Sequence, residues 1–326
     1  MSWNNLVRQV AVLGMTVAVA SSANAAGNAI AADTVIPTVF ESGHFYAVPK
    51  LVNGSSLRLL VDTGGGMSPA PFVNQAQADV LGLKTDHTCT SDGRTYQVAA
   101  PAYVDGKGLP DSSRRCRGVA VLPNEASNTP TGQVVPMYLK GSVWTFDYPM
   151  HRLVLRGSAW RASADAHKTR LGFKSLPDGA SAGWPRITIR VDGEVLNMLL
   201  DTGATAKPGA DALIENPRST TDGIGVGSYI VESTMKRWEK KHPEWKVIAQ
   251  GDTLFSAYTR MIRVPQIEIA GWHIGPVWFI ERPDRAFHGM MAMLMDQPPD
   301  GAVGANVFEQ FQMTLDYPHK TAWFQQ

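Results

Sequence analysis

The chain has 326 residues, of which 44% are hydrophobic and 18% charged, so it is long enough for two domains with substantial cores. Its formal net charge is +1 and neither sign forms a long block, which argues against a general electrostatic affinity for nucleic acid or for acidic membrane surfaces. The 30 Gly and 21 Pro residues favour short strands joined by turns over long helices.

The first 25 residues predict a secretory signal peptide. Arg8 supplies the positive charge, residues 10–20 form an apolar run, and Ala23 and Ala25 are the small residues that a signal peptidase reads. The apolar run has roughly half the length needed to cross a bilayer, and an uncleaved anchor is the alternative interpretation. We therefore expect an exported protein of the periplasm or the extracellular space, without stable membrane insertion after cleavage.

The segment after residue 50 predicts a β-hairpin that ends in an acidic corner. The Asn53-Gly54 dipeptide is a typical hairpin turn, and the apolar strand that follows leads into Asp62-Thr63-Gly64. An Asp at the end of a strand is by itself often a structural turn residue. One such motif in a chain of this size therefore carries little information.

The chain has two cysteines, Cys89 and Cys116, both in its first half. An even cysteine count in an exported chain predicts one disulfide bond. A metal site is the weaker alternative, because no His or Cys lies beside either cysteine at ligand spacing.

A second copy of the hairpin and its corner begins 139 positions later (201 minus 62), with Asp201-Thr202-Gly203 as the corner. The halves also end alike, since Asp147-Tyr148-Pro149 matches Asp316-Tyr317-Pro318 at a shift of 169 (316 minus 147). An internal repeat of this kind predicts two copies of one β-rich unit, the second with a net insertion of 30 residues (169 minus 139). The expected organisation is a signal peptide at 1–25, a first lobe at 26–160, a linker at 161–183 and a second lobe at 184–326.

Most of the second half reads as short strands and turns, with one exception. Residues 231–245 place Met235 and Trp238 among charged residues, a pattern typical of a surface helix. We expect this helix to account for part of the insertion.

Paired acidic corners predict a defined chemistry. Two carboxylates brought close together cannot both ionise cheaply, so they share one proton. The ionised carboxylate accepts a proton from a water between them, and the protonated one donates to a carbonyl oxygen, which adds water to an amide without a metal, cofactor or covalent intermediate. The eight His residues show no metal-ligand spacing. The predicted catalytic pair is Asp62 and Asp201, and the supporting residues are Thr63, Gly64, Thr202 and Gly203.

These corners, together with Ala302-Val303-Gly304 before the last strands, resemble the pepsin and retropepsin superfamily of aspartic proteases. The resemblance implies a mainly β fold of two homologous, β-barrel-like lobes with the active-site cleft between them. In that family the apolar-apolar-Gly element threads the loop that carries the catalytic Asp, and Leu139-Lys140-Gly141 is its expected counterpart in the first half. The resemblance also implies flap hairpins over the cleft, for which Tyr96 and Tyr258 are candidates.

The expected function is that of an aspartic endopeptidase acting on extended peptides or proteins, monomeric because one chain carries both acids. Two alternatives remain: an inactive relative that binds peptides without cutting them, and a β-rich envelope assembly component if the corners do not meet. Many family members carry Ser or Thr directly after the motif, where this chain has Gly65 and Ala204. Fewer donors to the carboxylates raise their pKa values, so we expect activity at mildly acidic pH.

Overall fold

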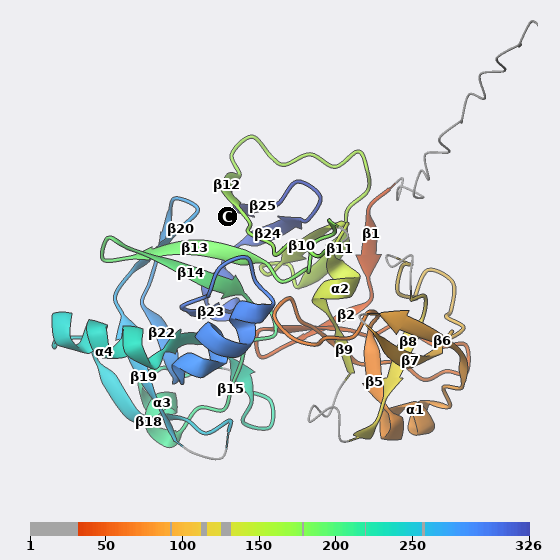
Figure 1. Ribbon diagram of the computed structural model, residues 1–326, viewed down its shortest axis with the longest axis horizontal. Coiled ribbons are helices and arrows are strands. Elements are labelled where there is room, and N and C mark those ends of the chain that lie inside the picture. Colours follow the sequence, from red (N-terminus) through yellow and green to blue (C-terminus); the bar gives the residue numbers. More distant parts are fainter. Residues whose placement is uncertain are drawn as a thin grey trace, which may run out of the picture.

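The computed structural model describes residues 32–91, 93–111, 116–124, 132–177, 179–218, 220–255 and 258–326. The predicted signal peptide at residues 1–25 lies outside these ranges. The fold is mainly β, with two lobes side by side and a sheet with strands from both halves of the chain between them (Figure 1). Within the described ranges, no helix is both long enough and apolar enough to span a membrane.

The first lobe is built on a sheet with strand order β2-β3-β4-β9-β5-β8-β7-β6. Helix α1 starts at a capping box, in which Asn74 accepts from the Gln77 amide while the Gln77 side chain returns to the Asn74 amide. The helix ends at Gly82, whose φ of 66° is a common helix stop. The elements of this lobe are β2 (Thr38–Glu41), β3 (His44–Ala47), β4 (Leu59–Val61), β5 (Phe72–Asn74), α1 (Gln75–Leu81), β6 (Thr85–Ser91), β7 (Arg94–Ala99), β8 (Val119–Leu122), β9 (Gly132–Val134) and α2 (Pro136–Leu139).

The second lobe has a sheet with strand order β18-β19-β22-β17-β23-β14-β13-β20-β21. Its first hairpin turns at Asp192 and Gly193, with φ of 47° and 80°, which is the left-handed geometry that an Asp-Gly turn adopts. The elements of this lobe are β13 (Arg186–Val191), β14 (Glu194–Leu200), β15 (Thr205–Ala206), α3 (Ala210–Glu215), β16 (Gly225–Val226), β17 (Ser228–Val231), α4 (Glu232–Lys241), β18 (Val247–Asp252), β19 (Thr259–Val264), β20 (Ile267–Ile269), β21 (Trp272–Ile274), β22 (Val277–Arg282), the π-helix η2 (Arg285–Met290), the 3-10 helix η3 (Met291–Met293), β23 (Gly301–Val303) and α5 (Ala305–Phe308).

The third sheet, called the interlobe sheet below, has the order β1-β11-β10-β24-β25-β12. Its two central strands come from opposite halves of the chain and pair antiparallel, with Thr145 opposite Thr314. Strand β12 lies inside the segment expected as a linker, so that segment contributes an edge strand. The strands are β1 (Thr34–Ile36), β10 (Val143–Asp147), β11 (Arg152–Leu155), β12 (His167–Arg170), β24 (Gln312–Asp316) and β25 (Thr321–Gln325).

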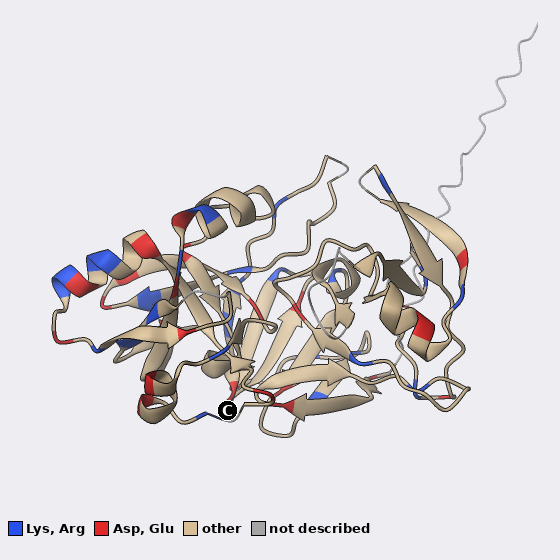
Figure 2. Cartoon of the chain, turned by 90° about the horizontal axis from the view of Figure 1, so that it is seen from below, with Lys and Arg blue, Asp and Glu red and all other residues tan. Residues whose placement is uncertain are grey.

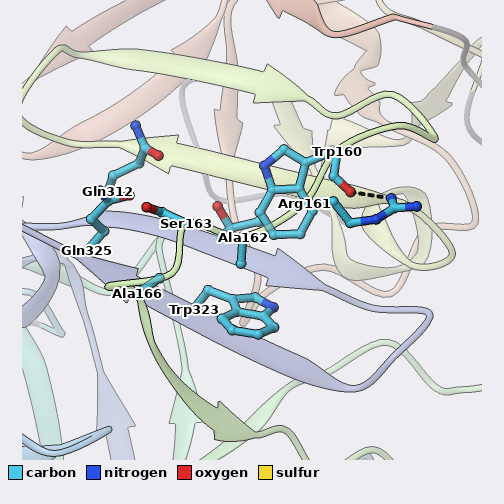
Figure 3. Close-up of a pocket in the computed structure, with 9 residues that line it drawn as sticks. Trp160, Arg161, Ala162, Ser163, Ala166, Gln312, Trp323 and Gln325 are labelled. Atoms are coloured by element: carbon cyan, nitrogen blue, oxygen red, sulfur yellow. Dashed lines mark hydrogen bonds between the residues drawn. The ribbon is translucent and has the colours of Figure 1, made fainter.

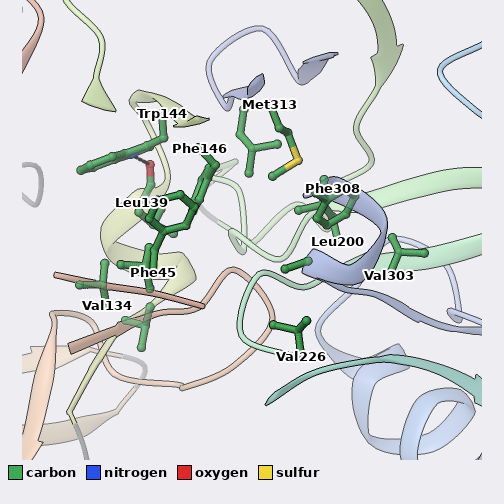
Figure 4. Close-up of a cluster of buried hydrophobic side chains, with 14 of the residues drawn as sticks. Phe45, Val134, Leu139, Trp144, Phe146, Leu200, Val226, Val303, Phe308 and Met313 are labelled. Carbon is green, nitrogen blue, oxygen red and sulfur yellow. Dashed lines mark hydrogen bonds between the residues drawn. The ribbon is translucent and has the colours of Figure 1, made fainter. Parts of the chain in front are cut away.

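One contiguous hydrophobic core joins the lobes rather than stopping at their boundary. Figure 4 shows Phe45 and Val134 from the first lobe on one side, and Leu200 and Val303 from the second lobe on the other. Phe146 of the interlobe sheet belongs to the same cluster. Because a close-packed interior has low compressibility, moving one lobe against the other would strain this shared core. The core therefore holds the lobes in a fixed relation near it.

The register of the strands corrects one prediction about the repeat. In the first lobe β4 pairs in parallel with β9, so that Val61 lies opposite Val134. In the second lobe β14 pairs in parallel with β23, so that Leu200 lies opposite Val303. The counterpart of Ala302-Val303-Gly304 is therefore residues 133–135, and the predicted Leu139-Lys140-Gly141 is wrong. The physical reason is that Val135 occupies the place of the glycine, which removed the feature that defined the motif.

The predicted helix at 231–245 is confirmed as α4, but the larger part of the insertion lies before it. Helix α4 directly follows β17, as α1 directly follows β5, so the two helices are equivalent. Phe72 and Tyr229 pair with the equivalent residues Gln133 and Ala302, which places their offset at 157 (229 minus 72). The offset is 139 at the corners, so the first block of extra residues lies between Gly203 and β17. It contains β15, α3 and β16.

Candidate active site

The two Asp-Thr-Gly corners occupy equivalent positions in the two lobes, each at the end of a buried strand. Asp62 follows β4, and its backbone amide donates to the carbonyl of Val134 at 2.9 Å. Asp201 follows β14, and its amide donates to the carbonyl of Val303, also at 2.9 Å. A parallel neighbouring strand therefore fixes the backbone of each acid.

The threonines of the corners bind the opposite lobe. The Thr63 hydroxyl donates to the carbonyl of Leu200 and the Thr202 hydroxyl donates to the carbonyl of Val61, both at 2.7 Å. Each hydroxyl also accepts from the other threonine's amide, at 3.2 Å to the Thr202 oxygen and 3.0 Å to the Thr63 oxygen. All of these groups are buried, where a lost hydrogen bond is expensive. The hydroxyls therefore bring the two corners together.

The glycines allow the two carboxyl groups to face each other. A Cβ atom on Gly64 would lie 2.3 Å from Cγ of Asp201, and one on Gly203 would lie 2.3 Å from Cγ of Asp62. Only glycine fits at either position. The backbone amides of Gly64 and Gly65 donate to Oδ1 of Asp62 at 2.8 and 2.7 Å, and the amide of Gly203 donates to Oδ1 of Asp201 at 3.0 Å.

The environment raises the pKa of both acids, by different amounts. Burial raises the pKa of Asp62, while the amide donors Gly64 and Gly65 partly offset that rise. Burial raises the pKa of Asp201 well above its ordinary value, and the neighbouring charge of Asp62 raises it further. The two carboxyl groups lie close enough to titrate as one unit.

Two tyrosines of the repeat, Tyr148 and Tyr317, lie near the acid pair. The sequence analysis assigned no role to them. Burial raises the pKa of Tyr148, and the charge of Asp201 adds to that rise. Burial raises the pKa of Tyr317, to which the charge of Asp62 contributes. The charge of each acid thus acts on the tyrosine that comes from the opposite half of the chain, in the same crossed pattern as the threonines. Their matching positions in the repeat were the sequence signal from which these tyrosines could have been found.

The candidate flap tyrosines have different surroundings. Tyr96 lies on β7, in the β6–β7 hairpin, and its hydroxyl donates to the carbonyl of Met67 at 3.3 Å. This contact brings the hairpin to the loop that follows the first corner. Tyr258 lies just before β19 and is 60% exposed. Its ring approaches Gly209 rather than either acid.

Cys89 and Cys116 form the predicted disulfide bond, with their Cα atoms 5.6 Å apart. The bond ties β6 of the β6–β7 hairpin to the loop before β8. Among the described residues, no cluster of His, Cys, Asp and Glu has a geometry that holds a metal ion. Lys and Arg are interspersed with Asp and Glu over both lobes (Figure 2).

One hollow of the surface lies away from the acids, against the interlobe sheet. It is a cavity of about 180 Å³ next to a broader groove of about 1000 Å³, and the segment after β11 forms one wall of both. Trp160 and Trp323 face each other across the cavity (Figure 3). Neither hollow contains a residue of the corners. The cavity is lined by Trp160, Arg161, Ser163, Gln312, Trp323 and Gln325 among others.

No family model matches the sequence, and the search of curated proteins finds no match. Solved structures similar to this chain include basic 7S globulin from soybean, with 12% identity, a TM-score of 0.46, and coverage of 91% of this chain and 94% of that chain. Aspartic proteinase from Irpex lacteus has 11% identity and a TM-score of 0.44, covering 90% and 97%. Conglutin gamma, a basic 7S globulin from lupine seeds, has 11% identity and a TM-score of 0.47, covering 90% and 95%. We infer nothing about activity from likenesses this distant.

Proposed function

We propose that this chain is an exported, monomeric aspartic endopeptidase that hydrolyses extended peptides or proteins with Asp62 and Asp201. The observation that carries the proposal is the crossed pair of threonine hydrogen bonds, which brings the buried Asp62 and the partly buried Asp201 close together at the matched corners. The predicted signal peptide and the disulfide bond support export. One chain supplies both acids, so a second copy is not required for catalysis.

The unequal environments assign the roles of the two acids. Asp62, stabilised as the anion by two backbone amides, accepts a proton from a water held between the carboxyl groups. Asp201, whose pKa is the more strongly raised, donates its proton to the carbonyl oxygen of the scissile amide. The resulting tetrahedral species collapses when Asp62 passes the proton taken from water to the amide nitrogen, the C–N bond breaks, and Asp201 takes back a proton from a hydroxyl of that species. The carboxyl pair ends each cycle with one proton, as it began.

The test uses purified mature protein and a mixture of peptides. Asp62→Asn and Asp201→Asn each should lower the rate of cleavage by about 10²–10⁴-fold or more, since each removes one of the two proton-transfer groups. Asp211→Asn is the matched control, because it makes the same chemical change on exposed helix α3. A statine-type inhibitor should compete with the substrate in the wild type.

The alternative function is peptide binding without hydrolysis. Peptide binding without cleavage at any pH would support this alternative over the peptidase. Cleavage that survives Asp201→Asn at the wild-type rate would instead remove the proposed mechanism and point to another nucleophile.

A further inference from the structure

The two acids are anchored differently on the side where the chain leaves each corner. At the first corner, the amide of Gly65 donates to Oδ1 of Asp62 at 2.7 Å. The equivalent residue at the second corner is Ala204 (65 plus 139), whose amide donates to the backbone carbonyl of Asp201 at 3.3 Å and also lies close enough to the Asp201 carboxyl to lower its pKa. The position of one backbone amide therefore affects the charge of each acid.

The chain after the second corner lacks the short connection that supports the first. Residues 65–71 link the first corner directly to β5, whereas residues 204–227 link the second corner to β17 and include β15, α3 and β16. A longer connection restrains its ends less. The Ala204-Thr205 dipeptide therefore needs support from residues outside this connection.

Tyr229 provides that support from within the second lobe. Its hydroxyl donates to the carbonyl of Thr205 and accepts from the amide of Thr205 at 2.8 Å, so it holds both backbone groups of one residue. In the first lobe the equivalent pair is Phe72 and Gly66, where the Phe72 ring lies 3.3 Å from the Cβ position of Gly66. The two lobes share the contact between the ring and the backbone. The hydroxyl is the addition made in the second lobe.

The Tyr229 ring is fixed in its turn by a buried ion pair. The guanidinium of Arg282 lies 4.3 Å from the centre of the ring and binds Asp252 at 3.0 Å, and both charged side chains are buried. The other carboxyl oxygen of Asp252 accepts from the amide of Lys207 at 2.7 Å. A paired and hydrogen-bonded buried charge holds a fixed geometry, because moving either partner exposes an uncompensated charge.

His44 reaches the same dipeptide from the first lobe. It is only 2% exposed, and its Nε2 lies 3.3 Å from the Thr205 hydroxyl. The turn before His44 is pressed against the second lobe, since a Cβ on Gly43 would lie 2.7 Å from Val226. The dipeptide is thus held by Tyr229 on one side and His44 on the other.

We propose that Tyr229 and His44 are positioning residues that grip Ala204-Thr205 from the two lobes and keep the Ala204 amide beside the Asp201 carboxyl. This inference rests on the proposed function only for its kinetic consequence. The grip itself follows from the contacts above, and it assigns a role to residues that neither corner motif includes.

The consequence is a shift in the titration of the acid pair when the grip is loosened. The titratable groups that face Asp201 are Asp62 across the pair, Tyr148 from the end of β10, and Tyr229 from β17. Behind Tyr229 lies Arg282, whose charge is neutralised by its buried partner. If the Ala204 amide moves away, the Asp201 anion loses a donor and the pKa of the pair rises. The alkaline limb of the pH–rate profile, which reports the loss of the Asp201 proton, then moves to higher pH.

The decisive variant is Tyr229→Phe, which removes only the hydroxyl and leaves the ring under Arg282. We expect the alkaline limb of the kcat/KM profile to shift upward by about 0.5–1 pH unit. Tyr138→Phe is the matched control, because it removes a tyrosine hydroxyl that donates to a backbone carbonyl, that of Pro110 at 2.6 Å, away from the corners. His44→Gln should shift the limb in the same direction, and thermal denaturation confirms that all variants are folded.

A second readout separates this inference from the proposed function. In protein labelled with ¹³C at aspartate carboxyl groups, NMR titration follows the acid pair directly, with Asp201→Asn to assign its signals. A shifted titration in Tyr229→Phe supports the grip even if the wild type cleaves no peptide, an outcome that would end only the peptidase proposal. An unchanged titration in Tyr229→Phe, or an equal shift in Tyr138→Phe, overturns the grip whatever the protein cleaves.

Discussion

The hydroxyl oxygens of Thr145 and Thr314 lie 2.7 Å apart in the buried centre of the interlobe sheet. The two residues are equivalent in the repeat (314 minus 145 is 169), and they face each other directly in the register of β10 and β24. The approximate two-fold axis that relates the lobes therefore passes between these hydroxyls. The same axis passes between the crossed Thr63 and Thr202 at the corners.

The hydrogen bond on this axis leads to a prediction about stability. Thr314→Val leaves the Thr145 hydroxyl with its other partner, the Arg156 side chain at 2.7 Å, so we expect a loss of about 1–2 kcal/mol in the free energy of unfolding. Combining it with Thr145→Val should cost less than the sum of the single changes, because the pair is lost only once. Chemical denaturation of the three variants checks this, and strictly additive losses would contradict it.

The hydroxyls of the crossed threonines at the corners should contribute to both stability and activity. Thr202→Val leaves the Val61 carbonyl and the Thr63 amide without their partner, so we expect a loss of about 2–3 kcal/mol in stability together with reduced activity. Thr202→Ser keeps the hydroxyl and should retain most of both. Denaturation and peptide cleavage, measured on the same preparations, distinguish the two variants; equal behaviour of Val and Ser would refute the role of the hydroxyl.

His44 should make the fold sensitive to acid. Burial lowers the pKa of His44 from 6.5 to about 4, so the unfolded chain binds its proton at higher pH than the folded chain does. The stabilisation from neutral His44 is fully present above about pH 6.5 and is lost as the pH falls toward 4, by at most about 3 kcal/mol. The difference in unfolding free energy between wild type and His44→Gln isolates this contribution from that of the carboxyl groups. A difference that does not change between pH 7 and 4 would exclude it.

The pH dependence of cleavage should respond to the residue after the second motif. Burial raises the pKa of both acids, so we expect the activity to peak at mildly acidic pH. Ala204→Ser adds a hydroxyl donor beside Asp201 and should shift the alkaline limb of the profile, where Asp201 loses its proton, to lower pH. The corresponding change at Gly65 is unsuitable, because a Cβ there would lie 2.3 Å from Oδ2 of Asp62. A wild-type maximum at strongly acidic pH would contradict the expectation.

The disulfide bond should stabilise the β6–β7 hairpin. It closes a segment of 27 residues, which corresponds to about 3 kcal/mol on the chain-entropy model. Reductant should therefore lower the melting temperature of the wild type and speed proteolysis within β6 and β7. The Cys89→Ser, Cys116→Ser double variant is the control, since its melting temperature should be low and independent of reductant.

The sequence was sufficient to predict the acids, the disulfide bond and the α4 helix, because each leaves a local signal. Repetition exposed Asp62 and Asp201, and cysteine count exposed the bond. The grip on Ala204-Thr205 left no such signal. Tyr229 and His44 come from distant parts of the chain, and a hydroxyl that binds backbone groups places no constraint on the residue types that flank it.

Glycine was a misleading guide in the first lobe. The search for an apolar-apolar-Gly element settled on Leu139-Lys140-Gly141, although residues 133–135 fill that place in the register. Val135 is tolerated there because the neighbouring loop adapts around it: at Gly66 a Cβ would lie 2.3 Å from the Val135 side chain. In the first lobe the glycine is therefore Gly66 of the neighbouring loop, whereas in the second lobe it is Gly304 of the element itself. Only the three-dimensional contacts reveal this exchange.

The place of β10 in the interlobe sheet has a consequence for the order in which this protein forms. Its neighbour β24 spans Gln312–Asp316, so β10 has no partner on that side until those residues have been synthesised. Pairings this far apart in sequence form slowly, because loop closure precedes any gain from contact. The first half therefore emerges from the ribosome with the interlobe sheet incomplete, and β10 and β24 pair only after both acid corners have been made.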